Sequence, residues 1–471
     1  MNPKKNSAFD FDMIVIGSGP AGQKAAIQAA KLRKKVAIID SRDLLGGNCV
    51  ITSTIPSKSF REAITFLSGY RQRSIYGAGY RVKSEIEMSD LTYRCSRLVQ
   101  TEVDIIRDQL LRNHIKIITG FATLDDKNTI SIREPDGSLT RKTAEFIVIA
   151  TGAHPYRPSN IHFDKTNIFD SDDILTMNEI PRTMTVVGGG VVGTEYASMF
   201  AALGVNVTIV DGRTKLLGFL DPEIIDSAHY HLRSMGVSLR LGEEVDKSEL
   251  RDDGSVITTL KSGKVIVSDA VLISAGRVSA TKDIGLEEIG INVEARGKIN
   301  VNEYFQTSVP NIYAVGDVIG FPGLAATASA QGRYAAAHAF GIADDVLQLP
   351  LPFGIYSIPE ISYVGKNETE LTEANVPYET GVARFKEIAR GQILGDEEGL
   401  LKVLFHRETL EILGVHIIGE SATELVHIGQ AAMTLKGGLH YLRDAVFNYP
   451  TLAECYKVAA FDGYNKIRSS R

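Results

Sequence analysis

The sequence predicts an α/β protein with two β-α-β nucleotide-binding units and an α+β region at its C-terminal end. Two glycine-rich turns predict the units, because residues 17–22 and 188–193 each follow a short apolar strand directly. A change of pattern near Leu351, to paired strands followed by helices, predicts the last region. With 471 residues, the chain exceeds the size of one hydrophobic core, so two to four domains are expected.

Composition excludes several classes of protein. The chain is 44% hydrophobic and 23% charged, as in ordinary globular proteins, and its net charge of -6 argues against a nucleic-acid binder. The longest apolar runs, such as residues 184–187, are far too short to span a membrane. The run at 13–16 is too short for a signal-peptide core, so a cytoplasmic location is expected. Three scattered cysteines, Cys49, Cys95 and Cys455, predict neither a disulfide framework nor a metal site.

The first unit has a strand at 11–16, a helix at 23–31 and a second strand at 36–39. Glycines in the turn allow the backbone to approach a ligand closely, so that a pyrophosphate can lie on the helix N-terminus. Asp40 ends the second strand, where a carboxylate would accept hydrogen bonds from ribose hydroxyls. The residues predicted to bind this dinucleotide are Gly17, Ser18, Gly19, Gly22 and Asp40.

The second unit repeats the pattern, with a strand at 183–187, a helix at 194–203 and a strand at 205–210 that ends in Asp211. Its predicted binding residues include Gly188, Gly190, Gly193 and Asp211, so two dinucleotides are expected. Asp211 is placed to accept the ribose hydroxyls of NAD, and Arg213 to pair with the 2'-phosphate of NADP. In the alternative reading Arg213 is a surface charge and the site prefers NAD alone.

Other segments complete the chain. We expect a long amphipathic packing helix at 88–112, and strands between 115 and 132 and at 145–149. A small antiparallel insertion is predicted at 239–267, with a parallel strand after it at 270–274. Later elements are a strand within 311–317, a helix at 324–339, strands at 400–405 and 412–418, and helices at 422–435 and 451–467.

Residues 46–58 resemble the redox-active helix of the FAD-dependent disulfide reductases, whose pattern is Gly-Gly-x-Cys, four residues, Cys-hydrophobic-Pro-x-Lys. Cys49 stands at the first cysteine position, but Thr54 stands at the second. A threonine hydroxyl cannot form a disulfide, so dithiol chemistry is excluded. The resemblance extends from about residue 11 to residue 467, with the motifs in the same order.

This resemblance implies an FAD domain in two parts, 1–155 and 278–348, an NAD(P) domain at 156–277 and an interface domain at 349–471. It also implies a homodimer or larger homo-oligomer with FAD bound and NAD and NADP as substrates. The further FAD-binding residues that it implies are Gly46, Gly47, Asn48, Cys49, Lys58, Thr151, Gly152, Asp317 and Ala325. For NAD(P) it adds Glu195 and Gly276.

A second departure from the reductase pattern lies near the C-terminus. Tyr449 occupies the position of a histidine that serves thiol exchange as an acid and base, and Glu454 would lack the imidazole that it orients. With an ordinary pKa near 10, a tyrosine is a poor proton shuttle at neutral pH. Both departures favour the branch of Si-specific NAD(P) transhydrogenases, which move hydride between NADPH and NAD through the flavin without a redox disulfide.

By resemblance, the catalytic residues are Lys58, paired with Glu195, together with Cys49 and Thr54 beside the flavin. Each has a plainer alternative. Lys58 would be a solvated lysine at the end of a loop, and Glu195 an acid in the first turn of a helix. Thr54 would be the cap of a helix that begins near residue 56, and Cys49 would only pack beside the flavin. The rival functions on the same fold are an NAD(P)H oxidase or quinone reductase (diaphorase), and a redox-silent flavin-binding adaptor.

Overall fold

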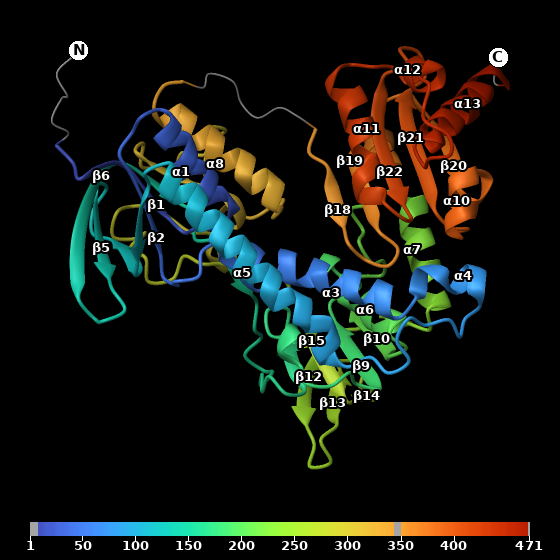
Figure 1. The fold of residues 1–471 in the computed structure, drawn as a ribbon, viewed down its shortest axis with the longest axis horizontal. Helices are drawn as coiled ribbons and strands as arrows, with labels where there is room; N and C mark the ends of the chain where they lie inside the picture. The colour runs from blue at the N-terminus through green and yellow to red at the C-terminus, as the bar shows by residue number, and fades with distance from the viewer. Residues whose placement is uncertain (1–7, 343–349, 470–471) are drawn as a thin grey trace. The chain divides into compact units, whose positions relative to one another are not determined.

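A computed structural model describes residues 8–342 and 350–469, which divide into two compact units (Figure 1). Each unit gathers segments that are far apart in the sequence. The predicted boundary between residues 348 and 349 lies outside the described residues, and the predicted domain limits stay predictions. Described residues of unit 1 are 8–59, 92–156 and 276–342, and those of unit 2 are 60–91, 157–275 and 350–469.

Unit 1 is built on a mixed sheet in the order β3-β2-β1-β6-β5-β4, with β17 also pairing with β6. Strands β1, β2, β3, β6 and β17 pair in parallel, whereas β4, β5 and β6 form an antiparallel meander. The strands are β1 (Phe11–Ile16), β2 (Val36–Asp40), β3 (Lys116–Thr119), β4 (Phe121–Leu124), β5 (Thr129–Arg133), β6 (Leu139–Ile149) and β17 (Ile312–Ala314).

The two faces of this sheet enter different cores because side chains alternate along a strand. Met13 and Val15 pack with α1 (Pro20–Lys31) and α8 (Ala325–Ala339), and Ile14 and Ile16 face the opposite core. The helices α1 and α8 lie side by side (Figure 1). Their approach requires a glycine, because a Cβ on Gly332 would lie 2.0 Å from the carbonyl oxygen of Ala21.

Other helices follow the first strands. They are α2 (Gly47–Ile51), α3 (Thr54–Leu67), α4 (Arg73–Tyr76) and α5 (Met88–Arg112). The helix α5 has the bounds that its periodicity predicts. A short antiparallel pair, β7 (Ala153–Pro155) and β16 (Arg277–Ser279), and the 3-10 turn η4 (Gly316–Ile319) also belong to unit 1.

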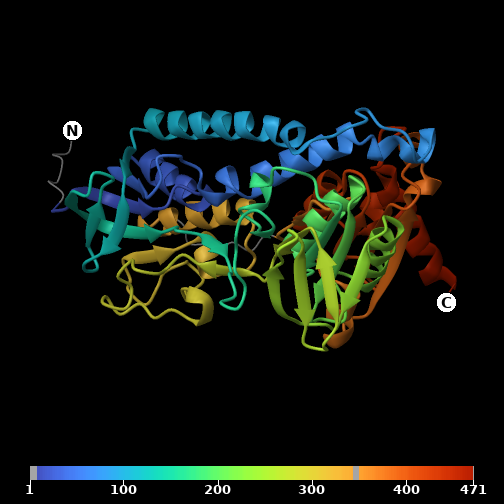
Figure 2. The same cartoon turned by 90° about the horizontal axis from the view of Figure 1, so that it is seen from below.

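Unit 2 contains a parallel sheet in the order β11-β10-β9-β15-β8. A separate antiparallel sheet, β12-β13-β14, is drawn in yellow-green in Figure 2. The elements are β8 (Ile168–Asp170), β9 (Thr183–Val187), α6 (Val191–Ala202), β10 (Asn206–Asp211), α7 (Pro222–Ser234), β11 (Ser238–Leu241), β12 (Val245–Leu250), β13 (Val256–Leu260), β14 (Val265–Ser268) and β15 (Ala270–Ile273).

The predicted limits of the antiparallel insertion were wrong at its start. Residues 239–241 belong to β11, which pairs in parallel with β10, so the insertion begins only at Val245. As an edge strand, β11 is only half covered, and its exposed and half-buried residues alternate. That alternation is the same signal that an antiparallel strand gives, so the sequence did not separate the two.

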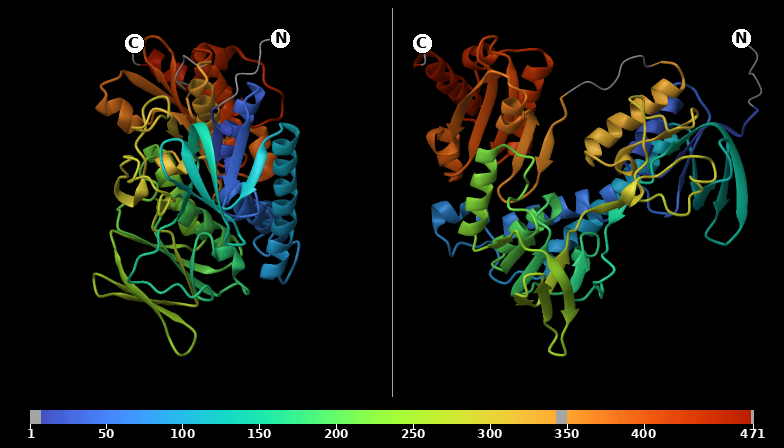
Figure 3. Two further views of the ribbon diagram at one scale, coloured as in Figure 1. Left: turned by 90° about the vertical axis from the view of Figure 1, so that its left-hand side faces the viewer. Right: turned by 180° about the vertical axis from the view of Figure 1, so that it is seen from behind.

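The C-terminal part of unit 2 is an antiparallel sheet in the order β18-β19-β22-β21-β20, drawn in orange and red in Figure 3. The sequence missed α9, α10 and α12, because a six-residue helix is too short to show periodicity. The elements are β18 (Phe353–Ile355), β19 (Ile361–Gly365), α9 (Glu368–Glu373), β20 (Tyr378–Arg384), α10 (Ala389–Leu394), β21 (Leu400–His406), β22 (Ile412–Ile418), α11 (Ala422–Thr434), α12 (Leu439–Asp444) and α13 (Glu454–Ser469).

A fully buried histidine lies on β22. His416 Nε2 is 2.9 Å from the carbonyl oxygen of Lys366, to which the neutral ring donates, and the ring stacks on Tyr363. Among the described residues, its Nδ1 atom is buried without a hydrogen-bond partner. Burial lowers the pKa of His416 below its usual 6.5. Protonation would therefore place an N–H group without an acceptor inside the sheet.

We expect acid to destabilise unit 2 through His416. Because the pKa is lower in the folded state than in the unfolded state, its contribution is fully present above about pH 6.5 and is lost as the pH falls toward the folded value. Between about pH 7.5 and about pH 5.5, His416→Phe should lose about 1 kcal/mol less unfolding free energy than the wild type in urea titrations. The exposed His427→Gln is the control, and an unchanged pH slope in His416→Phe would contradict the assignment.

Candidate dinucleotide sites

The first glycine-rich turn requires its glycines for close backbone contacts. A Cβ on Gly17, which has φ 106°, would lie 2.2 Å from the carbonyl oxygen of Ala150, and one on Gly22 would lie 1.9 Å from that of Gly17. A Cβ on Gly19 would meet nothing within 4 Å. The helix α1 has neither a side-chain cap nor an acidic residue in its first turn. Its N-terminus can therefore receive an anion.

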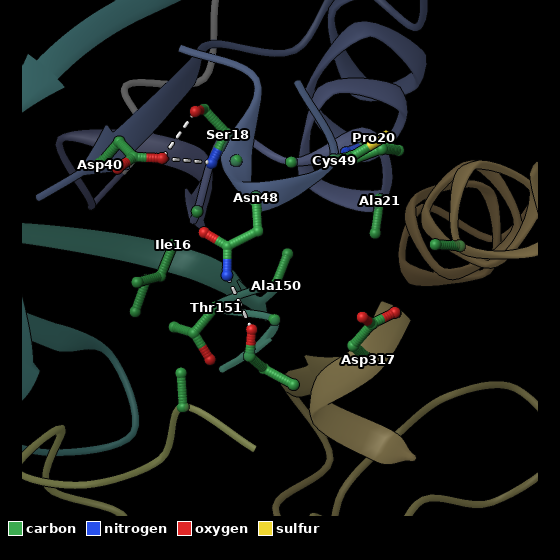
Figure 4. A pocket seen from close by; sticks show the side chains of 18 of the residues that line it. Ile16, Ser18, Pro20, Ala21, Asp40, Asn48, Cys49, Ala150, Thr151 and Asp317 are labelled. Atoms are coloured by element: carbon green, nitrogen blue, oxygen red, sulfur yellow. Dashed lines mark hydrogen bonds between the residues drawn. The ribbon is translucent and has the colours of Figure 1, made fainter. Parts of the chain in front are cut away.

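A cavity of about 340 Å³ opens beside this turn in unit 1 (Figure 4). It is lined by residues from all three segments of the unit, so the chain segments that the sequence assigned to one site do meet. Gly22, Gly46 and Lys58 do not line the cavity. The predicted residues that do are Gly17, Ser18, Gly19, Asp40, Gly47, Asn48, Cys49, Thr54, Thr151, Gly152, Asp317 and Ala325.

At one side of the cavity, Asp40 organises the turn. Its Oδ2 accepts hydrogen bonds from Ser18 N (2.9 Å) and Ser18 Oγ (2.6 Å), and its Oδ1 accepts one from Arg42 N (3.0 Å) (Figure 4). Ser18 Oγ in turn accepts from the backbone N–H of Gly46. Gly46 therefore supports the site from behind, and Asp40 is held where the sequence predicts a ribose.

Polar groups also lie on the opposite wall. Burial raises the pKa of Asp317, and the Arg277 guanidinium, whose Nε lies 4.0 Å from Asp317 Oδ2, opposes the rise. Thr151 Oγ1 is buried without a hydrogen-bond partner among the described residues. A half-buried carboxylate and an unsatisfied hydroxyl facing one cavity fit a polyhydroxylated chain such as a ribityl group. The donor set is thus consistent with FAD.

Cys49 and Thr54 also line the cavity, where their side chains are hydrogen-bonded to each other. Burial raises the pKa of the Cys49 thiol, and a hydrogen bond from the Thr54 side chain only partly opposes the rise. Because the thiolate is the reactive form, Cys49 is not an activated nucleophile at neutral pH. Within the described residues, none of the three cysteines forms a disulfide. The alternative in which Thr54 caps a helix near residue 56 was wrong, because α3 begins at Thr54 itself.

The second glycine-rich turn, in unit 2, repeats the first. Gly188 has φ 101°, and a Cβ on Gly193 would lie 1.9 Å from the carbonyl oxygen of Gly188, whereas one on Gly190 would meet nothing within 4 Å. The helix α6 begins at Val191, so Glu195 lies beyond its first turn and the first-turn alternative was wrong. Glu195 is buried, and its Oε1 accepts a hydrogen bond from Tyr356 N at 2.8 Å.

Asp211 and Arg213 form a closed fork at the end of β10. Arg213 Nε lies 2.9 Å from Asp211 Oδ1, and Nη2 lies 2.6 Å from Oδ2, which also accepts from Gly189 N. Burial alone would raise the pKa of Asp211, but the hydrogen bonds from Arg213 and Gly189 outweigh it and lower the pKa below 3.8. The acid and the base that the sequence assigned to two different nucleotides therefore neutralise each other here.

Several predicted roles stay predictions. The carbonyl oxygen of Gly276 accepts from Tyr156 N, and Ser274, two residues earlier, donates to the carbonyl oxygen of Gly188 in the second turn. Lys58 lies in unit 1 and Glu195 in unit 2, so their pairing stays a prediction. Tyr449 is 74% exposed.

Sequence reasoning missed two arginines that line the first cavity. Arg42 donates to Asn48 Oδ1 at 3.0 Å, and the Asn48 amide donates to Ala153 O (Figure 4). Arg277 donates to the same carbonyl oxygen. Only their positions in the sequence could have indicated a place at this cavity. Arg42 lies two residues after Asp40, and Arg277 follows the small residues 275–276.

The fold and the two turns define a flavin- and nicotinamide-type oxidoreductase class, and family models agree. The chain belongs to the pyridine nucleotide-disulphide oxidoreductases: residues 11–332 match the model of that description, and residues 351–460 match its dimerisation domain. As a member, it is an oxidoreductase.

Similar proteins from several bacteria share one name. A protein of Mycobacterium bovis BCG, named soluble pyridine nucleotide transhydrogenase, is 52% identical over 461 residues and 98% of each chain is covered. Proteins of the same name from Colwellia psychrerythraea and Pseudomonas aeruginosa are 45% identical, over 98% of this chain and 99% and 100% of theirs.

Solved structures support the same fold. LpdA of Mycobacterium tuberculosis is 27% identical, with a TM-score of 0.89, over 95% of this chain and 99% of that one. The HOCl-induced flavoprotein disulfide reductase RclA of Escherichia coli is 25% identical, with a TM-score of 0.86, over 96% and 99%. Within the described residues, no helix has the length and apolar character needed to cross a membrane.

Proposed function

We propose that this protein is an FAD-dependent, Si-specific transhydrogenase that moves hydride between NADPH and NAD without a redox disulfide. The observation that carries the proposal is the Cys49–Thr54 hydrogen bond beside the cavity of unit 1, at the position where the family pattern has a dithiol. The names of the relatives support the same activity. A cytoplasmic location, as the sequence predicts, belongs to the proposal.

The residues that would hold FAD are those of the unit 1 cavity. Asp40 would accept ribose hydroxyls, the N-terminus of α1 would receive the pyrophosphate, and Asp317 with Thr151 would bind the ribityl chain. When bound, the flavin supplies the hydride-accepting and hydride-donating centre. Cys49 and Thr54 would remain neutral, so the part of the cavity that they line would contain no thiolate nucleophile. Lys58, in our proposal paired with Glu195, would place positive charge beside the ring.

The alternating use of two nucleotides would fall to the fork in unit 2. With NAD, Asp211 would accept the ribose hydroxyls. With NADPH, the Arg213 side chain would leave Asp211 and pair with the 2'-phosphate. An ion pair between Asp211 and Arg213 suits this exchange better than Asp211 alone, because an unpaired carboxylate would repel the 2'-phosphate.

Dimerisation is also part of the proposal, because residues 351–460 match a dimerisation domain. The most exposed large apolar or aromatic side chains described there are Leu435 (81%), Val446 (93%) and Tyr449 (74%). Light scattering during gel filtration should report a dimer or larger assembly. A monomer at micromolar concentration would contradict this part.

An anaerobic two-step mixing experiment tests the function. One equivalent of NADPH should bleach the flavin absorbance, and excess NAD should then restore it as NADH forms. Recovery only with oxygen or a quinone would instead indicate an oxidase or diaphorase. Failure of both NADPH and NADH to bleach the flavin would indicate a redox-silent protein.

A further inference from the structure

The loop 212–220 joins β10 to α7 and carries Arg213 near its start. Beyond the fork, the loop packs on the glycine-rich turn, because a Cβ on Gly189 would lie only 2.1 Å from Leu216 Cδ2. Leu216, Leu217 and Leu220 are each at most 2% exposed. The carbonyl oxygen of Arg213 accepts from Gly242 N at 3.0 Å. The loop backbone is thus fixed near the turn, while the contact that holds the Arg213 side chain, among the described residues, is its ion pair with Asp211.

Residues of the C-terminal part hold the far end of the same loop. Asp221, which is fully buried, accepts from Glu223 N as the cap of α7, and its Oδ1 lies 2.8 Å from Lys402 Nζ. Its Oδ2 accepts from Glu368 N at 3.3 Å. Two residues before Asp221, the carbonyl oxygen of Phe219 accepts a hydrogen bond from Asn367 Nδ2 at 3.2 Å.

Lys402 lies at the centre of the contacts that hold the far end of the loop. It lies on β21, is 1% exposed, and contacts three carboxylates, those of Asp221, Glu223 and Glu368. Burial alone would lower the pKa of Lys402, but its hydrogen bonds to Asp221 and Glu368 outweigh burial and raise it. The lysine therefore stays charged inside the protein.

The surrounding charges explain why a single ammonium suffices for three acids. Asp221 caps α7 and Glu368 begins α9, so the positive ends of two helix dipoles converge on the acids. The carboxylate oxygens of Asp221, Glu223 and Glu368 lie within 4.8 Å of one another, a spacing that suits a cation, and the Lys402 ammonium occupies that role.

We propose that Lys402 is a positioning residue for discrimination between NADP(H) and NAD(H). It acts through Asp221 and the loop 212–220 on Arg213, and so rests on the proposed role of Arg213 with the 2'-phosphate. With the loop fixed at both ends, only the Arg213 side chain has to move when nucleotides exchange. When the far end is released, the loop backbone spreads over several positions, and the guanidinium is no longer presented to the phosphate.

The test uses two ligands that differ by that phosphate alone, 2',5'-ADP and 5'-AMP, and measures their Kd on the purified full-length protein. Lys402→Met should raise the Kd of 2',5'-ADP relative to that of 5'-AMP about fivefold or more. Asp221→Asn keeps the cap acceptor but loses the charge, so it should shift the same ratio if Lys402→Met fails to fold. Lys386→Met, at an exposed site on the C-terminal part, is the matched control and should leave the ratio unchanged.

A structural role alone would weaken both ligands equally, and that result would overturn the proposal. The second check repeats Lys402→Met in an Arg213→Ala background. There the substitution should no longer change the ratio, because the residue through which it acts is gone. A ratio that responds to Arg213→Ala but not to Lys402→Met or Asp221→Asn refutes this inference alone. A ratio that ignores Arg213→Ala refutes the proposed role of Arg213, and neither result depends on hydride transfer.

Discussion

Arg213→Ala should lower kcat/KM for NADPH about 50-fold, because charge-assisted hydrogen bonds to a phosphate contribute about 1.5–3 kcal/mol. The loss should lie mainly in KM, since the 2'-phosphate is remote from the reacting carbon. For NADH, kcat/KM should stay the same or rise. Removal of the guanidinium leaves each oxygen of Asp211 with only a backbone N–H donor, so both oxygens gain room to accept from ribose hydroxyls.

Steady-state and stopped-flow rates of flavin reduction with each nucleotide measure this change. Arg251→Ala removes an exposed arginine from the turn after β12 and is the matched control. Equal losses with NADPH and NADH would contradict a phosphate-specific role. No loss with either would return Arg213 to the class of surface charges, as in the alternative reading of the sequence.

Local sequence patterns predicted most of the frame. Strand β1 and helix α5 have their predicted bounds, because a buried apolar run and a long 3.6-residue periodicity are signals within one element. The helix α6 began three residues before its predicted start. Gly193 argues against a helix by propensity, yet lies inside α6 because its missing Cβ lets the helix approach the carbonyl oxygen of Gly188.

The contacts of the candidate sites were less predictable than their residues. The sequence named Asp211 and Arg213 as separate binding groups, but it did not show that they would pair with each other, with Gly189 N as a further donor to Asp211. Lys402 reads as a single basic residue in the apolar strand 400–405. Its partner Asp221 is 181 positions away in the sequence, and a pattern of neighbouring residues cannot predict a pair so far apart.

Gly22→Ala should raise the Kd of FAD at least about tenfold, because each 1.4 kcal/mol of lost binding free energy is a factor of ten in Kd. The added Cβ would lie 1.9 Å from the carbonyl oxygen of Gly17, so α1 and the turn must separate. Overpacking of this kind costs about 1–3 kcal/mol, so the thermal stability of the apoprotein should fall as well. The ratio of flavin to protein absorbance and a melting curve measure the two effects.

Two matched glycines separate folding from cofactor binding. A Cβ on Gly19 meets nothing within 4 Å, but Gly19 lines the cavity, so Gly19→Ala should lose FAD while the apoprotein keeps its melting temperature. Gly79→Ala, exposed and equally free of neighbours, should change neither. Full FAD content in Gly19→Ala would mean that the pyrophosphate does not lie at this turn, because a methyl group there would occupy the space through which the backbone approaches the phosphates.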